Sequence, residues 1–151
     1  MIAFSRFFAS FAGIGFLPFA PGTWGSLAAA LILFFFPLNN LIIFAALIGL
    51  LSVLGAVASH IIEKNEGLED PGWIVIDEVV GMWIALFALP HNPVIFLVAF
   101  ILFRFFDIKK PWLIDKIQSV AYGWGVMLDD ILAGFAALLI NVFLIYIGIY
   151  T

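Results

Sequence analysis

The charged side chains of this sequence are few, and several of them sit in pairs inside segments that are otherwise apolar. The segment DPGWIVIDEVVGMW places Asp77 beside Glu78, and YGWGVMLDDILAG places Asp129 beside Asp130. Clustered carboxylates without thiols or suitably spaced histidines favour a hard cation such as Mg²⁺. The predicted metal ligands, which are also predicted catalytic residues, are Asp77, Glu78, Asp129 and Asp130.

Two further segments carry groups suited to phosphate. In FRFFDIKKPW, Arg104 and Asp107 are three residues apart and therefore neighbours on a helix surface. Arginine offers a fork that matches phosphate, and Lys110 adds a point charge for the same anion. In PGTWGS, Thr23 and Ser26 can donate hydrogen bonds to a phosphate at a helix start. We predict Arg104 and Asp107 as catalytic residues, and Thr23, Arg104 and Lys110 as substrate-binding residues.

Each of these segments has a simpler interpretation. The Asp77–Glu78 pair can be an interfacial pair at a helix N-terminus, where the helix dipole favours negative charge. Arg104 and Asp107 can form an internal ion pair while nearby lysines grip anionic lipid headgroups. The remaining two segments can be an acidic helix cap and a turn. The functional interpretation gains weight only if all four segments converge on one face.

The composition indicates that this chain lies in a membrane. Of its 151 residues, 66% are apolar and 11% are charged, and the mean hydropathy is +1.24. A soluble domain carries about a quarter charged residues, so the chain is predicted to be a single membrane domain over residues 1–151. A net charge of −4 argues against nucleic acid as a partner. Without cysteine, the chain has neither disulfides nor thiolate metal sites.

The fold is predicted to be all-α, with four or five transmembrane helices after an interfacial N-terminal arm over residues 1–21. About 20 apolar residues are needed to cross the hydrocarbon core, and 26–36 crosses only if it begins earlier, tilts or thins the membrane. The predicted spans lie near residues 26–36, 41–59, 73–89, 94–105 and 128–150.

The connections between these spans differ in charge. The short turns 37–40 and 90–93 carry no charged residue, whereas the longer connections 60–72 and 108–127 are charged. With five spans, all lysines and arginines fall on one side, which the positive-inside rule assigns to the cytoplasm. The four polar segments then meet on that side, which suggests metal-assisted phosphoryl chemistry on a lipid. The positive residues are Arg6, Lys64, Arg104, Lys109, Lys110 and Lys116.

The four segments PGTWGS, DPGWIVIDEVVGMW, FRFFDIKKPW and GVMLDDILAG, in this order, resemble the bacterial phosphatidylglycerophosphatase A family. The resemblance covers the chain from about Pro21 to Gly134. It implies a Mg²⁺-dependent enzyme of the bacterial inner membrane that converts phosphatidylglycerophosphate to phosphatidylglycerol and phosphate. Its polar pattern matches Thr23, Asp70, Asp77, Glu78, Arg104, Asp107, Lys110, Asp129 and Asp130.

The sequence departs from the family pattern at two points. Ala121-Tyr122-Gly123 stands where many members have His-Gly-Gly, and Pro111-Trp112-Leu113 stands where many have Pro-Trp-Pro. The first departure removes a histidine that would be a candidate general acid. The remaining histidines, His60 and His91, are expected to be structural.

Three alternatives remain open at this point. Acidic groups in membranes also serve ion- or proton-coupled transporters, although the acidic residues here lie away from the middle of the spans. A scaffold that binds anionic lipid, or a different lipid phosphotransferase with an Asp-rich metal site, would also fit. The sequence leaves the oligomeric state unknown.

Overall fold

A computed structural model of the chain describes residues 2–68, 70–110 and 123–150. The described residues form α-helices joined by turns, with a short 3-10 helix and no strand among them. The prediction of an all-α fold is confirmed. The elements are α1 (Ile2–Ala9), η1 (Ile14–Phe16), α2 (Pro21–Phe35), α3 (Leu41–Glu66), α4 (Ile76–Ala85), α5 (Pro93–Lys109) and α6 (Trp124–Tyr146).

Two of these helices are long and apolar enough to cross a bilayer. α3 has 26 residues with a mean hydropathy of 2.7, and α6 has 23 residues with a mean hydropathy of 2.0. α2 and α5 are shorter, with 15 and 17 residues. Among the described helices, length and composition support membrane insertion for α3 and α6.

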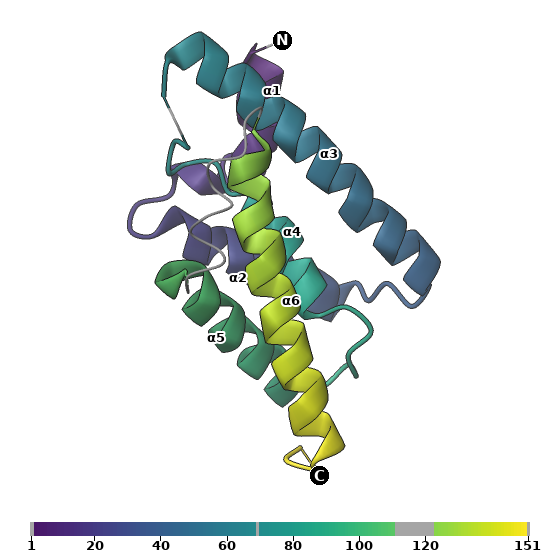
Figure 1. The fold of residues 1–151 in the computed structure, drawn as a ribbon. Helices are drawn as coiled ribbons and strands as arrows, with labels where there is room; N and C mark the ends of the chain where they lie inside the picture. Colours follow the sequence, from purple (N-terminus) through teal and green to yellow (C-terminus); the bar gives the residue numbers. More distant parts are fainter. Residues whose placement is uncertain (1, 69, 111–122, 151) are drawn as a thin grey trace.

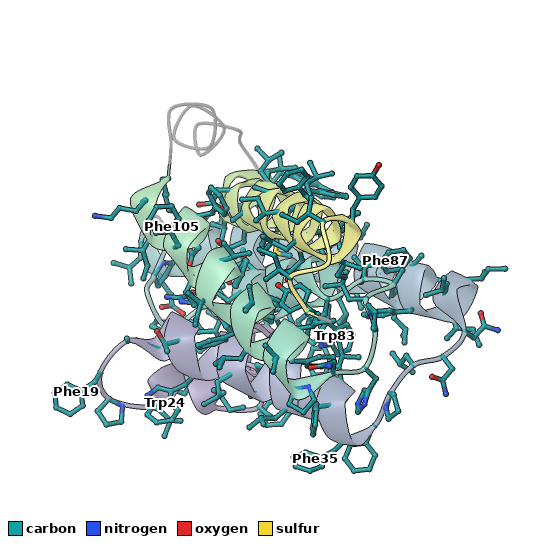
Figure 2. All side chains as sticks on the ribbon, turned by 90° about the horizontal axis from the view of Figure 1, so that it is seen from below. Phe19, Trp24, Phe35, Trp83, Phe87 and Phe105 are labelled. Carbon is teal, nitrogen blue, oxygen red and sulfur yellow. The ribbon has the colours of Figure 1, made fainter. Side chains whose placement is uncertain are left out.

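The central helix is α4, which α2, α3, α5 and α6 surround (Figure 1). All but one of its ten residues are buried. Trp83 of α4 donates its indole N–H to the Ala29 carbonyl oxygen of α2 at 3.2 Å. Figure 2 shows Phe19 and Phe35 at the periphery of the molecule, where most of each side chain is exposed. Large apolar side chains thus face outward, as expected where lipid is the solvent.

α4 is shorter than the predicted segment 73–89. The residues before it are not helical, because the backbone N–H of Val75 donates to the Ala9 carbonyl oxygen of the N-terminal arm at 2.9 Å instead of to a carbonyl of its own segment. After Ala85 the chain turns, and Ala88 adopts a positive φ of 58° shortly before Pro90. Ten residues rise about 15 Å, about half of the hydrocarbon core.

Two glycines bring α4 and α6 into close contact. A Cβ added at Gly134 of α6 would collide with the Gly81 carbonyl oxygen of α4. A Cβ at Gly81 would lie 2.6 Å from the Asp130 carbonyl oxygen. Because neither position has room for a side chain, the two backbones pack closely beside the polar end of both helices.

The helix ends that carry charge lie together. α2, α4 and α6 begin at this end, and α3 and α5 finish there, as the ion pairs and hydrogen bonds between them show. At the edge of this end, Arg6 of α1 pairs with Glu66 of α3 at 2.7 Å.

Candidate active site

Three carboxylates from two helices form the centre of the candidate site. Asp77 and Glu78 lie in the first turn of α4, and Asp130 faces them from α6. Each offers one oxygen, and these oxygens all lie within 4.8 Å of one another. Asp77 and Asp130 are 7% and 2% exposed, so both are largely removed from water.

Each of these carboxylates has one oxygen without the partner that a buried charge normally has. Oδ1 of Asp77, Oε2 of Glu78 and Oδ2 of Asp130 are buried without a hydrogen-bond partner among the described residues. Leaving such groups unpaired is costly. A divalent cation with oxygen ligands at 2.0–2.6 Å would hold opposite ligands about 4–5 Å apart, which matches the spacing of this group. The three residues therefore fit a hard metal ion.

Arg104 on α5 lies beside this acidic group. Its Nη1 is 2.5 Å from Oδ2 of Asp107 and 3.9 Å from Oε1 of Glu78. The same nitrogen donates to the Ser26 hydroxyl at 3.3 Å, and that hydroxyl donates to the Gly22 carbonyl oxygen at 2.6 Å. The guanidinium group is thereby held where α2, α4 and α5 meet. A cation at this position can bind the oxygens of a phosphate close to the predicted metal.

Gly22 allows α2 to approach the acidic pair. A Cβ at this position would fall on the Glu78 carboxylate and would lie 3.1 Å from Nη1 of Arg104. Thr23, the next residue, is half-buried in the first turn of α2. The start of α2 therefore forms one wall of the site.

Asp129 and Lys110 form a second polar group. Nζ of Lys110 is 2.6 Å from Oδ2 of Asp129, and Oδ1 of Asp129 accepts the backbone N–H of Asp130 at 3.0 Å. Asp129 is thus directed toward Lys110, outside the group of three carboxylates. Its predicted role as a metal ligand stays a prediction.

Asp70 lies in the connection before α4. Its backbone N–H donates to Oε1 of Glu63 at 3.4 Å. Loss of water around the carboxyl group, followed by repulsion from Asp129, raises the pKa of Asp70 above its usual value, although the residue keeps an exposed surface. The electrostatic contact with Asp129 places Asp70 at the rim of the polar end.

The sequence did not single out Ser26 and Gly22 for the roles they have here. Ser26 was expected only as a possible phosphate donor, whereas its hydroxyl accepts a hydrogen bond from Arg104. The available signal was their spacing, because residues four apart share a helix face. The departures at Pro111-Trp112-Leu113 and Ala121-Tyr122, and Lys116, lie outside the described residues.

Neither histidine lies among the three carboxylates. His91 Nε2 is hydrogen-bonded to the Phe34 carbonyl oxygen at 2.8 Å, in the turn at the opposite end of α2 and α5. His60 lies in α3, where its backbone N would be 2.7 Å from a Cβ at Gly123.

The sequence model of the family Phosphatidylglycerophosphatase A matches residues 7–145. The chain belongs to this family. A protein of Escherichia coli named Phosphatidylglycerophosphatase A is 40% identical over 124 residues, which cover 81% of this chain and 72% of that protein. One of Haemophilus influenzae with the same name is 40% identical over 131 residues, covering 85% and 80%.

A third relative carries a different name. A Bacteroides thetaiotaomicron protein, provisionally named a phosphatidylinositol-3-phosphatase, is 45% identical over 130 residues, which cover 81% of each chain. No solved structure matches the chain. The predicted family and its enzyme class, a lipid phosphatase, are confirmed, and the comparisons give no support to the transporter alternative.

Proposed function

We propose that this protein is a Mg²⁺-dependent phosphatidylglycerophosphatase that acts at the cytoplasmic face of the bacterial inner membrane. It hydrolyses the terminal phosphomonoester of phosphatidylglycerophosphate to phosphatidylglycerol and phosphate. The observation that carries this proposal is the group of buried, unpartnered carboxylate oxygens beside Arg104. Family membership supports the reaction.

Asp77, Glu78 and Asp130 would hold the ion. When bound, Mg²⁺ supplies Lewis-acid polarisation of the phosphate and offsets the charge of the carboxylates. Its oxygen-only donor set is the kind that Mg²⁺ prefers. Asp129 remains a candidate additional ligand once Lys110 turns toward the substrate.

Arg104 binds the phosphate and stabilises the charge that develops on its oxygens. Asp107 orients the guanidinium through its contact with Nη1. Lys110 adds a second positive charge, and Thr23 offers its hydroxyl from the start of α2. These residues bind and orient the reacting group, which is the main contribution of proteins to phosphoryl transfer.

The distribution of positive charge supports a cytoplasmic location of the polar end. Arg6, Lys64, Arg104, Lys109 and Lys110 belong to the helices or helix ends that meet there. The turns at the opposite end, 36–40 and 86–92, contain no lysine or arginine. With α3 and α6 as full spans and α2, α4 and α5 completing the bundle, the chain forms one membrane domain of four or five spans.

The reaction is tested with the purified protein in detergent. Phosphate release is measured from phosphatidylglycerophosphate with and without Mg²⁺, and from phosphatidic acid as a comparison. We expect Mg²⁺-dependent release that is selective for phosphatidylglycerophosphate. Absence of release from a folded protein would refute the proposal.

Phosphatidylinositol 3-phosphate is the second candidate substrate, because a relative 45% identical to the chain bears that name. It belongs in the same assay as a third lipid. A higher kcat/KM for this lipid than for phosphatidylglycerophosphate would reassign the substrate and leave the phosphatase chemistry in place.

The orientation is tested with single cysteines, since the chain has none of its own. Asn39→Cys in the uncharged turn should react with a membrane-impermeant maleimide in intact spheroplasts. Lys64→Cys near the polar end should react only after lysis. The reverse pattern would place the site on the outer face.

A further inference from the structure

An apolar groove lies between α2 and α5. It has a volume of about 290 Å³, and all of its lining residues are apolar. Leu27 and Leu31 belong to one wall, and Leu97 and Phe100 belong to the other. Leu31 and Leu97 are 45% and 58% exposed, so the groove is open along its side.

The walls of the groove belong to the same helix faces as two residues of the candidate active site. Phe100 and Leu97 precede Arg104 by four and seven residues, which places all three on one face of α5. Thr23 precedes Leu27 by four residues on α2 in the same way. The two predicted phosphate-binding residues therefore lie at the polar end of the two groove walls.

Aromatic rings lie at the opposite end of the groove. Phe34 and Phe96 meet edge to face with centroids 5.4 Å apart, and His91 stacks on Phe34 at 4.7 Å. The 11 residues from Thr23 to Phe34 span about 16 Å along α2. This is about half of the 30 Å hydrocarbon core, the depth of one leaflet.

From this arrangement we propose that the groove receives one acyl chain of the phosphomonoester lipid whose headgroup binds at Arg104. This inference rests on the proposed function and extends it to the apolar part of the substrate. A polar end suited to a phosphate and an apolar groove beyond it, together about one leaflet deep, match the two halves of such a lipid. A partner helix, about 10 Å across, is too wide for a groove of this volume.

The groove aligns the lipid headgroup with the carboxylates of the site. An acyl chain leaves one apolar environment for another, so its transfer from lipid to groove gains packing and little hydrophobic free energy. A chain seated between α2 and α5 holds its headgroup over the carboxylates. Because a misplacement of about 1 Å can reduce a rate about a hundredfold, this alignment affects turnover.

The test fills the groove from either wall with Leu97→Trp and Leu27→Trp. Leu139→Trp, at a 68% exposed position on α6, is the matched control. Each purified variant is assayed with dipalmitoyl and with dibutyryl phosphatidylglycerophosphate, whose short chains do not extend far along the groove. We expect both groove variants to lose at least about tenfold in kcat/KM with the long-chain lipid and less than twofold with the short-chain lipid. The control should change neither value.

Equal losses with both lipids, or no loss with either, would overturn the proposal. Failure of the wild type to hydrolyse any lipid would instead count against the proposed function. Occupancy of the groove is then decided by photocrosslinking with phosphatidic acid that carries a diazirine in mid-chain. Label concentrated in 21–35 and 93–109, and reduced by Leu97→Trp, supports the proposal, whereas label spread evenly over α3 and α6 overturns it.

Discussion

Asp130→Asn should show that the acidic cluster destabilises the metal-free protein and is nevertheless needed for metal binding and activity. Two unit charges 4.8 Å apart, the largest separation within the cluster, repel by about 3.5 kcal/mol at an effective dielectric constant of about 20. Asp130 takes part in two of the three pairs, so replacing it removes about 7 kcal/mol of repulsion. The wild type can avoid this repulsion by protonating one carboxyl group, which costs about 4 kcal/mol at pH 7. The destabilisation of the wild type by the cluster therefore cannot exceed about 4 kcal/mol. In chelator, Asp130→Asn should therefore be more stable than wild type by about 1–4 kcal/mol.

The assay is thermal unfolding in detergent with EDTA and then with Mg²⁺. Each kcal/mol corresponds to about 2–4 °C in Tm for a chain of this size, so Asp130→Asn should unfold several degrees above wild type in EDTA. Mg²⁺ should raise the Tm of wild type and leave that of the variant nearly unchanged. Phosphatase activity of the variant should fall at least about a hundredfold, as for loss of a major electrostatic contact to the transition state.

Asp129→Asn is the matched control, because it makes the same change at the neighbouring residue. Asp129 pairs with Lys110 at 2.6 Å, so its replacement weakens an attraction and should lower Tm in EDTA. If Asp130→Asn also lowered Tm in EDTA, or kept both its activity and its response to Mg²⁺, the assignment of the cluster as a metal site would be refuted.

Three further substitutions test the surroundings of the cluster. Arg104→Lys should keep the fold and lower kcat/KM about a hundredfold, because lysine cannot reproduce the guanidinium fork; a value near wild type in the phosphate-release assay would argue against a phosphate contact. Gly22→Ala should displace Glu78 and abolish the rise of Tm with Mg²⁺. An unchanged rise would show that α2 can move away from Glu78 without disturbing the metal site. Gly134→Ala, which collides with the Gly81 carbonyl oxygen, should destabilise by about 1–3 kcal/mol, measured as a lower Tm, and equal stability would contradict the close α4–α6 contact.

The sequence predicts the helical elements where local composition decides them. α3 and α6 follow from their long uncharged or nearly uncharged runs, and the turns between helices follow from proline and asparagine. The start of α4 does not follow, because Trp73 to Val75 are as apolar as the helix itself. Their conformation depends on the hydrogen bond from Val75 to Ala9, a contact between segments more than 60 residues apart. Hydropathy carries no information about such a contact.

The candidate site shows the same division. Residue types alone predict an acidic group with a neighbouring arginine, and the structure brings Asp77, Glu78, Asp130 and Arg104 together. Which of two adjacent aspartates faces the group cannot be read from the sequence, because neighbours on a helix point about 100° apart. The rotation of α6 decides it, and the Gly134–Gly81 contact fixes that rotation through packing.

The position of each carboxylate on its helix determines how much it depends on the metal. Asp77 and Glu78 lie in the first turn of α4, where the helix dipole favours negative charge. Asp130 is the seventh residue of α6, beyond the first turn to which that effect is confined. Arg104 pairs with Glu78 and Asp107, so Asp130 has neither the helix dipole nor an ion pair with this arginine to offset its charge. A bound cation is therefore worth most to Asp130, which is why its replacement, rather than that of Asp77, should give the largest contrast between EDTA and Mg²⁺.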